Sequence, residues 1–183
     1  MLATMTVAVL GAVSACSGPA TSMTSSHHVT PSIPAPTSVS PSGTLDPQAQ
    51  AALAAYREAW QDLAIVSDEG NYQDPRLSAH LSGQLLLTTS QDLYLEESHG
   101  IASKGAPILH PRVVGENLSA RPPTVAIADC IDFRQFVQYY KTTGQPFGTA
   151  QKGMSADLTT MSTVTGVWSV TTQKMQADGS CTA

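Results

Sequence analysis

The chain has 183 residues, with nine Lys and Arg against fourteen Asp and Glu, and a formal net charge of −5. An acidic chain without clustered basic side chains is not suited to bind nucleic acid or an anionic lipid surface. Every charged residue lies at or after Asp46, and the first Phe, Tyr or Trp is Tyr56. The composition therefore separates an uncharged N-terminal segment from a C-terminal part with the size of one domain.

An apolar run at residues 5–15 precedes Cys16 and is too short to cross a bilayer, which takes roughly 20 residues. The segment Val13-Ser14-Ala15-Cys16 resembles the lipobox of bacterial lipoproteins, in which the cysteine is lipidated and becomes the first residue. The resemblance implies a signal peptide at residues 1–15 and a membrane anchor on Cys16, at the extracytoplasmic face of the cell membrane. Val13 stands where leucine is usual and no Lys or Arg precedes the run, which leaves plain secretion as the alternative.

Residues 16–46 are rich in Ser, Thr and Pro. Such a segment cannot bury enough apolar surface to offset the entropy lost on ordering, so we expect a disordered tether. A flexible coil of about 30 residues spans roughly 30 Å. His27 and His28 lie in this segment without a third ligand, which favours two solvated side chains over a metal site.

Residues 47–183 are predicted to form one domain that begins with helices. Apolar side chains recur every three or four residues between 47 and 67, as in an amphipathic helix. Asp74 and Pro75 are typical of the start of a second helix, and Gly100 of its end. The pattern leaves open whether this is one helix of about 25 residues or two that are broken near residues 88–90.

After Gly100 the apolar residues alternate, as in strands with one buried face. Val125, Ile127 and Asp129 share one face of such a strand, and Thr165-Gly166 is typical of a hairpin turn. The expected strands cover about residues 106–115, 124–133, 154–164 and 167–177, with an irregular hairpin at 135–141. Helices followed by antiparallel strands predict an α+β fold, with the N-terminal helices packed on one face of a sheet of about four strands.

Several motifs in this order resemble small actinobacterial lipoproteins of the nuclear transport factor 2-like superfamily, over about residues 48–182. The motifs are Ala55-Tyr56, a long second helix ending in Gly100, Gly105 with Pro107, Asp129-Cys130-Ile131-Asp132, Thr165-Gly166-Val167-Trp168-Ser169-Val170 and Gly179-Ser180-Cys181. The resemblance implies that the sheet is curved into a cone. It implies a fold more than a function, although ketosteroid isomerases and scytalone dehydratase use Tyr, Asp or His inside such a cone.

Cys130 and Cys181 remain after lipidation of Cys16, and an exported chain most simply pairs two such cysteines. In a meander, one strand separates them, which places their backbones about 10 Å apart at about 4.8 Å per strand. A disulfide cannot reach that far. The segment 178–180 must therefore curl across the end of the intervening strand, and Gly179 permits this. Two free thiols are the less favoured alternative outside the cytoplasm.

The side chains that could carry chemistry are scattered over separate elements. They are Tyr56, His80, His99, His110, Asp129, Asp132, Tyr139 and Tyr140. Asp129 and Asp132 lie three apart on a strand and so face opposite sides, which excludes a carboxylate dyad between them. Tyr56 fits the core stripe of its helix, and His80 is typical of a boundary position. His99, beside Gly100, suits a cation at a helix C-terminus.

No nucleophile with an adjacent base, metal-ligand spacing or phosphate loop is recognisable in the sequence. We therefore expect no cofactor, no bound metal and no catalytic residues, and a non-enzymatic binding or interaction module whose partner is a protein or a small apolar ligand. A small-molecule carrier that uses the cone as its pocket is an alternative, and so is an isomerase or dehydratase of the ketosteroid isomerase type. Two ionisable side chains that converge in a pocket would favour the enzyme.

Overall fold

The computed structural model describes residues 44–183. The predicted signal peptide, Cys16, the two tether histidines and all but the last three residues of the predicted tether lie outside the described residues. No helix among residues 44–183 is long and apolar enough to cross a membrane.

Helix α1 (Pro47–Glu69) has a capping residue at each end. The Asp46 carboxylate accepts a hydrogen bond of 2.8 Å from the amide of Gln48, and Pro47 follows at the first helical position. At the other end Gly70 adopts a left-handed conformation with φ 73° and donates its amide to the Val66 carbonyl. The predicted helix is confirmed and extends two residues further than expected.

The second helical segment consists of two helices, α2 (Pro75–His80) and α3 (Gly83–Ser98). The chain breaks at Leu81 and Ser82, not near residues 88–90. Leu81 forms an isolated parallel bridge with Val170 of the last strand, and the Ser82 amide donates to the Val170 carbonyl at 3.1 Å. The break therefore depends on pairing with a strand almost 90 residues further along the chain.

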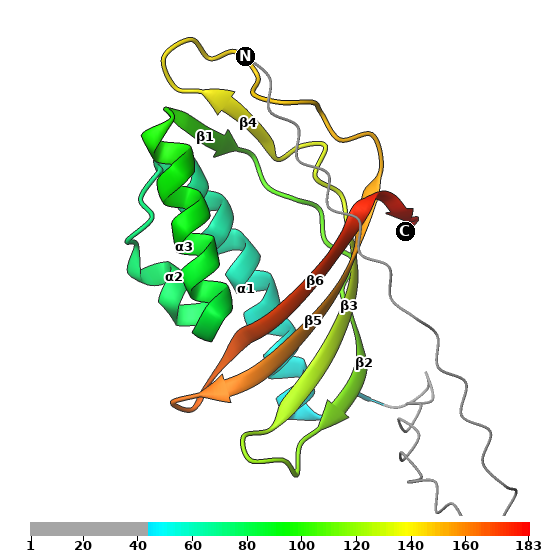
Figure 1. Cartoon of the computed structure of the whole chain (residues 1–183). Coiled ribbons are helices and arrows are strands. Elements are labelled where there is room, and N and C mark those ends of the chain that lie inside the picture. The colour runs from blue at the N-terminus through cyan, green and yellow to red at the C-terminus, as the bar shows by residue number, and fades with distance from the viewer. Residues whose placement is uncertain (1–43) are drawn as a thin grey trace, which may run out of the picture. The chain divides into compact units, whose positions relative to one another are not determined.

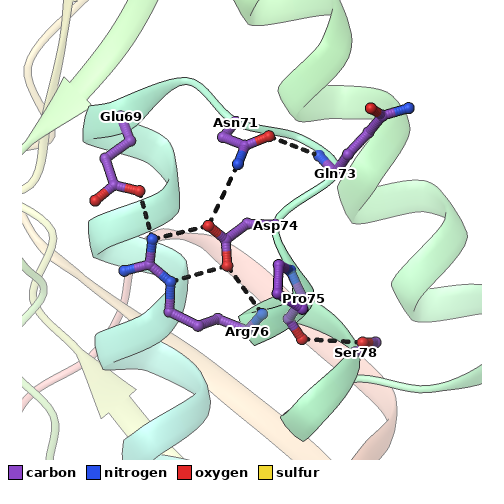
Figure 2. A network of polar contacts seen from close by, with 7 residues as sticks. All are labelled: Glu69, Asn71, Gln73, Asp74, Pro75, Arg76 and Ser78. Atoms are coloured by element: carbon purple, nitrogen blue, oxygen red, sulfur yellow. Dashed lines mark hydrogen bonds and ion pairs between the residues drawn. The ribbon is translucent and has the colours of Figure 1, made fainter.

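A polar network holds the turn between α1 and α2 (Figure 2). The Asp74 carboxylate accepts from the Arg76 amide at 2.9 Å, from its Nε at 2.9 Å and from its Nη2 at 2.8 Å. Arg76 also pairs with Glu69 at the end of α1. The Arg76 guanidinium holds the pKa of Asp74 at about 2, well below its ordinary value. These charges satisfy one another, so the network is structural.

Four antiparallel strands form the main sheet, in the order β2-β3-β5-β6, and two more form a separate small sheet. The main strands are β2 (Arg112–Asn117), β3 (Thr124–Ile131), β5 (Met154–Val164) and β6 (Val167–Cys181); the small sheet pairs β1 (Ile101–Lys104) with β4 (Val137–Tyr140). The three helices lie against one face of the curved main sheet (Figure 1). The α+β fold predicted from the sequence is therefore confirmed.

Two of the predicted strands differ from those observed. The edge strand expected at 106–115 is replaced by β1 and β2, which belong to different sheets, and between them Ile108 forms an isolated bridge with Asp132. The irregular hairpin expected at 135–141 contributes β4, which pairs with β1. Pro107 and Pro111 lie in the segment between β1 and β2, and proline has no backbone N–H to donate to a sheet. This explains why the segment does not form a single strand.

The core lies between α1 and the inner face of the main sheet. Tyr56 of α1, Val125 and Ile127 of β3 and Met161 of β5 are fully buried there. Trp60 extends this core to the Phe133 ring in an edge-to-face contact, with ring centroids 5.6 Å apart. Aspartates interrupt the apolar inner face at one level of the sheet, described below.

A disulfide joins Cys130 of β3 to Cys181 at the end of β6, with their Cα atoms 5.9 Å apart. Strand β5 lies between β3 and β6 along most of their length, so the tail must cross the start of β5 to make this bond. Gly179, with φ 79°, passes so close to Gly153 that a Cβ on Gly153 would lie 2.7 Å from the Gly179 Cα. The expected curl of the tail is confirmed.

Candidate functional site

A cavity of about 390 Å³ opens where α1 and α3 meet β4 and the segment that follows it. Leu63 of α1 and Leu93 of α3 line its apolar side. The chain contains three phenylalanines, and all three line this cavity: Phe133, Phe136 and Phe147. We call it the phenylalanine cavity. Phe133 and Phe136 lie with ring centroids 6.5 Å apart, so they present a continuous aromatic wall to an incoming molecule.

Two carboxylates share this cavity with the aromatic rings. Asp92 and Glu96 lie one turn apart on α3, and both line the space. The side-chain amide of Gln138, on β4, donates to Glu96 Oε1 at 2.6 Å. Burial raises the pKa of Glu96 above its ordinary value, and the charge of Asp92 adds to the effect. No Lys, Arg or His of residues 44–183 lines the cavity.

A second cluster of polar side chains lies in the core at the centre of the sheet. Asp129 of β3 and Asp157 of β5 stand directly opposite each other in register, and they are only 4% and 3% exposed. The Tyr56 hydroxyl reaches both carboxylates, at 3.0 Å from Asp129 Oδ2 and 3.3 Å from Asp157 Oδ2. Thr159 and Gln173 also donate to Asp157 Oδ2, at 2.7 and 3.2 Å.

The cluster has fewer donors than its carboxylate oxygens need. A phenol has one hydrogen, so at any moment Tyr56 donates to one aspartate only. Asp157 Oδ1 has no hydrogen-bond partner among the described residues. Burial raises the pKa of Asp129, hydrogen bonds from the His110 amide and Tyr56 offset part of this rise, and the charge of Asp157 makes a smaller contribution that raises it. Burial beside two carboxylates also raises the pKa of Tyr56, which therefore stays protonated.

A second, narrow cavity lies between this cluster and the phenylalanine cavity. Tyr56 and Gln173 line this space of about 30 Å³, and Leu63 and Thr89 line both cavities. A volume of 30 Å³ holds about one water molecule. A substrate in the larger cavity therefore has no open path to the Tyr56 hydroxyl in this conformation.

The histidines predicted as candidates do not enter either site. His80 lies between two acids of α1, with Nδ1 2.9 Å from Asp62 and Nε2 3.1 Å from Glu58, so it ties α2 to α1. His99 follows the last turn of α3, where its amide bonds to the Leu95 carbonyl at 3.1 Å. His110 has an exposed side chain, and only its backbone amide approaches the cluster, 2.6 Å from Asp129.

The remaining predicted residues also lie apart. Asp132 pairs with the Arg134 guanidinium at 2.6 and 2.8 Å, and its pKa falls to about 2 as a result. The Tyr139 hydroxyl donates to Asp68 of α1 at 3.2 Å, and Tyr140 packs edge-to-face on Phe147. Asp129 and Asp132 thus do not meet, as expected. Asp129 instead has a carboxylate neighbour that was not among the predicted residues, because Asp157 faces it from the adjacent strand.

Sequence reasoning missed Asp157, Asp92 and Glu96. One signal for Asp157 was available, because Asp129 and Asp157 both occupy inward positions of strands whose other inward residues are buried. The sequence alone could not assign Asp92 and Glu96 to a cavity, because the segment after β4 that completes this cavity is remote from α3 along the chain. Among residues 44–183, no group of three or more His, Cys, Asp and Glu is arranged to hold a metal ion.

Compared with known proteins, the chain matches no family model and no curated protein. Among solved structures, the crystal structure of the intermembrane space region of the chloroplast protein ARC6 matches it with a TM-score of 0.47 and 12% identity. That match covers 74% of this chain and 100% of the other. Similarity at this level carries no information about activity, so the function has to be argued from the geometry of the two sites.

Proposed function

We propose that this protein is an extracytoplasmic lipoprotein, tethered to the membrane through Cys16, whose α+β domain binds a small, largely apolar molecule in the phenylalanine cavity. The observation that carries the proposal is the gathering of all three phenylalanines around one open space. Protein interiors are close-packed, and aromatic rings that border an open cavity of about 390 Å³ lack the packing contacts of an interior on that side. A ligand would restore them.

The size and lining of the cavity support this proposal. Small-molecule sites are typically concave spaces of about 300–1,000 Å³ with mostly apolar walls and a few polar groups. Here the three phenylalanines, Leu63, Leu93 and Val137 form the apolar part of the wall. Polar side chains also line the space: Ser67, Thr89, Asp92, Glu96, Ser103, Gln138, Thr149 and Gln151. Helices packed on a curved sheet, with a cavity beside them, also suit the nuclear transport factor 2-like superfamily whose motifs the sequence resembles, and membership in it is part of the proposal.

Acid–base catalysis is the second candidate, because the Tyr56 hydroxyl lies within hydrogen-bond reach of both Asp129 and Asp157. The cluster, however, adjoins a space for about one water molecule and not for a substrate. Its carboxylates are also engaged by the backbone and by neighbouring side chains of the sheet. These features favour a binding function, with the cluster as part of the core.

The proposal can be tested with a neutral fluorescent probe, N-phenyl-1-naphthylamine, and the full chain carrying Cys16→Ser. Ala150 lines the cavity and is exposed, so Ala150→Trp fills the space without disturbing the core. We expect the probe to fluoresce with the parent protein and to bind at least tenfold more weakly to Ala150→Trp. Val167→Trp, at an exposed position on the hairpin outside the cavity, is the matched control and should bind the probe normally. Equal binding by both variants would place the probe elsewhere.

A further inference from the structure

We propose that the phenylalanine cavity selects an amphiphilic organic cation, a molecule with an apolar body and a protonated amine. This inference rests on the proposed function and adds the chemical class of the ligand. The amine would lie at Glu96 and Asp92, and the apolar body against the phenylalanine rings.

The charges that line the cavity are all of one sign. Asp92 and Glu96 are its ionisable residues, and the described part of the chain contributes no basic side chain to the lining. Two like charges one helical turn apart repel each other. A cation between them removes this repulsion, whereas a carboxylate ligand would add to it. The cavity therefore discriminates against anions by charge alone.

Glu96 is held in position to receive a donor. Its Oε1 accepts from the Gln138 amide at 2.6 Å, and no hydrogen bond from residues 44–183 engages Oε2. The side chain is half-buried, so its charge loses part of its hydration without gaining a basic partner. A charge-assisted hydrogen bond from an ammonium group would compensate that loss, and such bonds are about twice as strong as neutral ones.

The nearest lysine on the adjoining strand is turned away from the cavity. Ser103 of β1 lines the cavity, and Lys104 follows it on the opposite face of the strand. The Lys104 ammonium lies 5.3 Å from the centroid of the Tyr139 ring, which occupies it in a cation–π contact. The cavity acids therefore lack an internal counter-ion on β1, as a site for an external cation requires.

The phenylalanine rings suit the same ligand class. An aromatic face attracts a cation within about 6 Å and also packs against an apolar chain. Phe133 and Phe136 provide two neighbouring rings, and Phe147 is partly exposed at the segment that follows β4. An arylalkylamine would satisfy both the rings and the carboxylates in one orientation.

Three compounds of equal length test the inference: 3-phenylpropylamine, 3-phenylpropanol and 3-phenylpropanoate. Each is titrated against the bound N-phenyl-1-naphthylamine at pH 7 with the full chain carrying Cys16→Ser. We expect the amine to bind at least tenfold more tightly than the alcohol, and the alcohol more tightly than the carboxylate. In Glu96→Gln, which keeps the shape of the side chain, the preference for the amine over the alcohol should fall below threefold.

Glu97→Gln is the matched control, because Glu97 is the neighbouring glutamate of α3, is exposed and does not line the cavity. It should keep the full preference for the amine. An alcohol that binds as tightly as the amine, or an amine preference that Glu96→Gln leaves intact, would overturn the ligand class while the binding function stands. If neither the probe nor any of the three compounds binds, the proposed function itself fails.

Discussion

Tyr56, Asp129 and Asp157 show how a buried polar cluster can depend on a proton. Two carboxylates directly opposite each other on neighbouring strands repel when both are ionised, and the repulsion is strong where water is excluded. A proton shared by the pair removes the repulsion and lets one carboxyl act as a donor. Burial is the main cause of the raised pKa of Asp129, and the charge of Asp157 adds to it in the same direction.

The pH dependence of stability should follow from that shift. A carboxyl whose pKa is higher in the folded than in the unfolded state stabilises the fold below the ordinary value of about 3.9. That contribution is lost as the pH rises through the raised pKa of Asp129. We therefore expect Asp129→Asn to become more stable relative to the parent protein as the pH rises. Urea denaturation between pH 5 and 8 measures the difference.

Asp132→Asn is the control for this measurement. The pKa of Asp132 is lowered to about 2 by Arg134, so its contribution is constant above pH 5 and lost only as the pH falls toward 2. The difference between Asp132→Asn and the parent should therefore be flat from pH 5 to 8. A flat difference for Asp129→Asn as well would contradict the proton-sharing interpretation.

Among the elements, α3 begins at a residue with an unusual backbone conformation, directly after the break that pairs with β6. Gly83 has φ 59°, in the left-handed region, and a Cβ added there would meet no atom within 4 Å. Any cost of Gly83→Ala is therefore conformational and not steric. We expect a loss of about 1 kcal/mol in the free energy of unfolding.

Gly115→Ala provides the comparison for Gly83→Ala. Gly115 of β2 lies outside the left-handed region, and its added Cβ would make an ordinary contact of 3.7 Å with Ala126. Its stability should stay within about 0.5 kcal/mol of the parent protein. If both alanine variants lose the same amount, the break does not depend on the conformation of Gly83.

The tail of β6 is held by the disulfide and by polar contacts across the start of β5. The Asp178 carboxylate accepts from the amides of Lys152 and Gly153, at 2.9 and 2.8 Å, and the Ser180 hydroxyl accepts from the Ala156 amide at 2.8 Å. These bonds replace the regular ladder where the register shifts. The crossing tail is therefore satisfied in its hydrogen bonding independently of the disulfide.

Removal of the disulfide should mainly stabilise the unfolded chain. Cys130 and Cys181 are separated by 51 residues, and opening such a loop costs about 4 kcal/mol of stability in the entropy model. We expect the double variant Cys130→Ala, Cys181→Ala to lose about that amount in guanidinium denaturation. The parent protein with a reductant should behave like the double variant, and a reductant should leave the variant unchanged. A parent protein that is insensitive to reductant would contradict this expectation.

At the scale of the whole molecule, the proposed lipid anchor on Cys16 would decide where the cavity is displayed. A diacylated Cys16 would supply the two chains that stable membrane attachment requires. We expect the parent protein to partition with detergent and Cys16→Ser to appear in the medium. A Cys16→Ser variant that still partitions with detergent would place the anchor elsewhere, and a parent protein found in the medium would favour plain secretion.

Local signals in the sequence were sufficient for much of the fold. Apolar periodicity predicted α1, and the Asp74-Pro75 pair predicted the start of α2, because both signals involve residues close to each other in the chain. The hairpin at Thr165-Gly166 and the strand before it were also predicted correctly, because turn residues and alternating apolar residues are local signals too. The curl at Gly179 followed from the short reach of a disulfide.

Only the tertiary structure decided which distant residues meet. The break at Leu81 depends on Val170, the division into two sheets depends on the pairing of β1 with β4, and Asp129 acquires its partner from the register of β5. The phenylalanine cavity likewise joins α3 to the segment after β4. Periodicity and capping reflect neighbours along the chain, whereas a site forms where remote elements pack. The sequence by itself therefore determined α1, the start of α2, the strands β3, β5 and β6 and the disulfide, whereas packing determined the remaining elements and the candidate site.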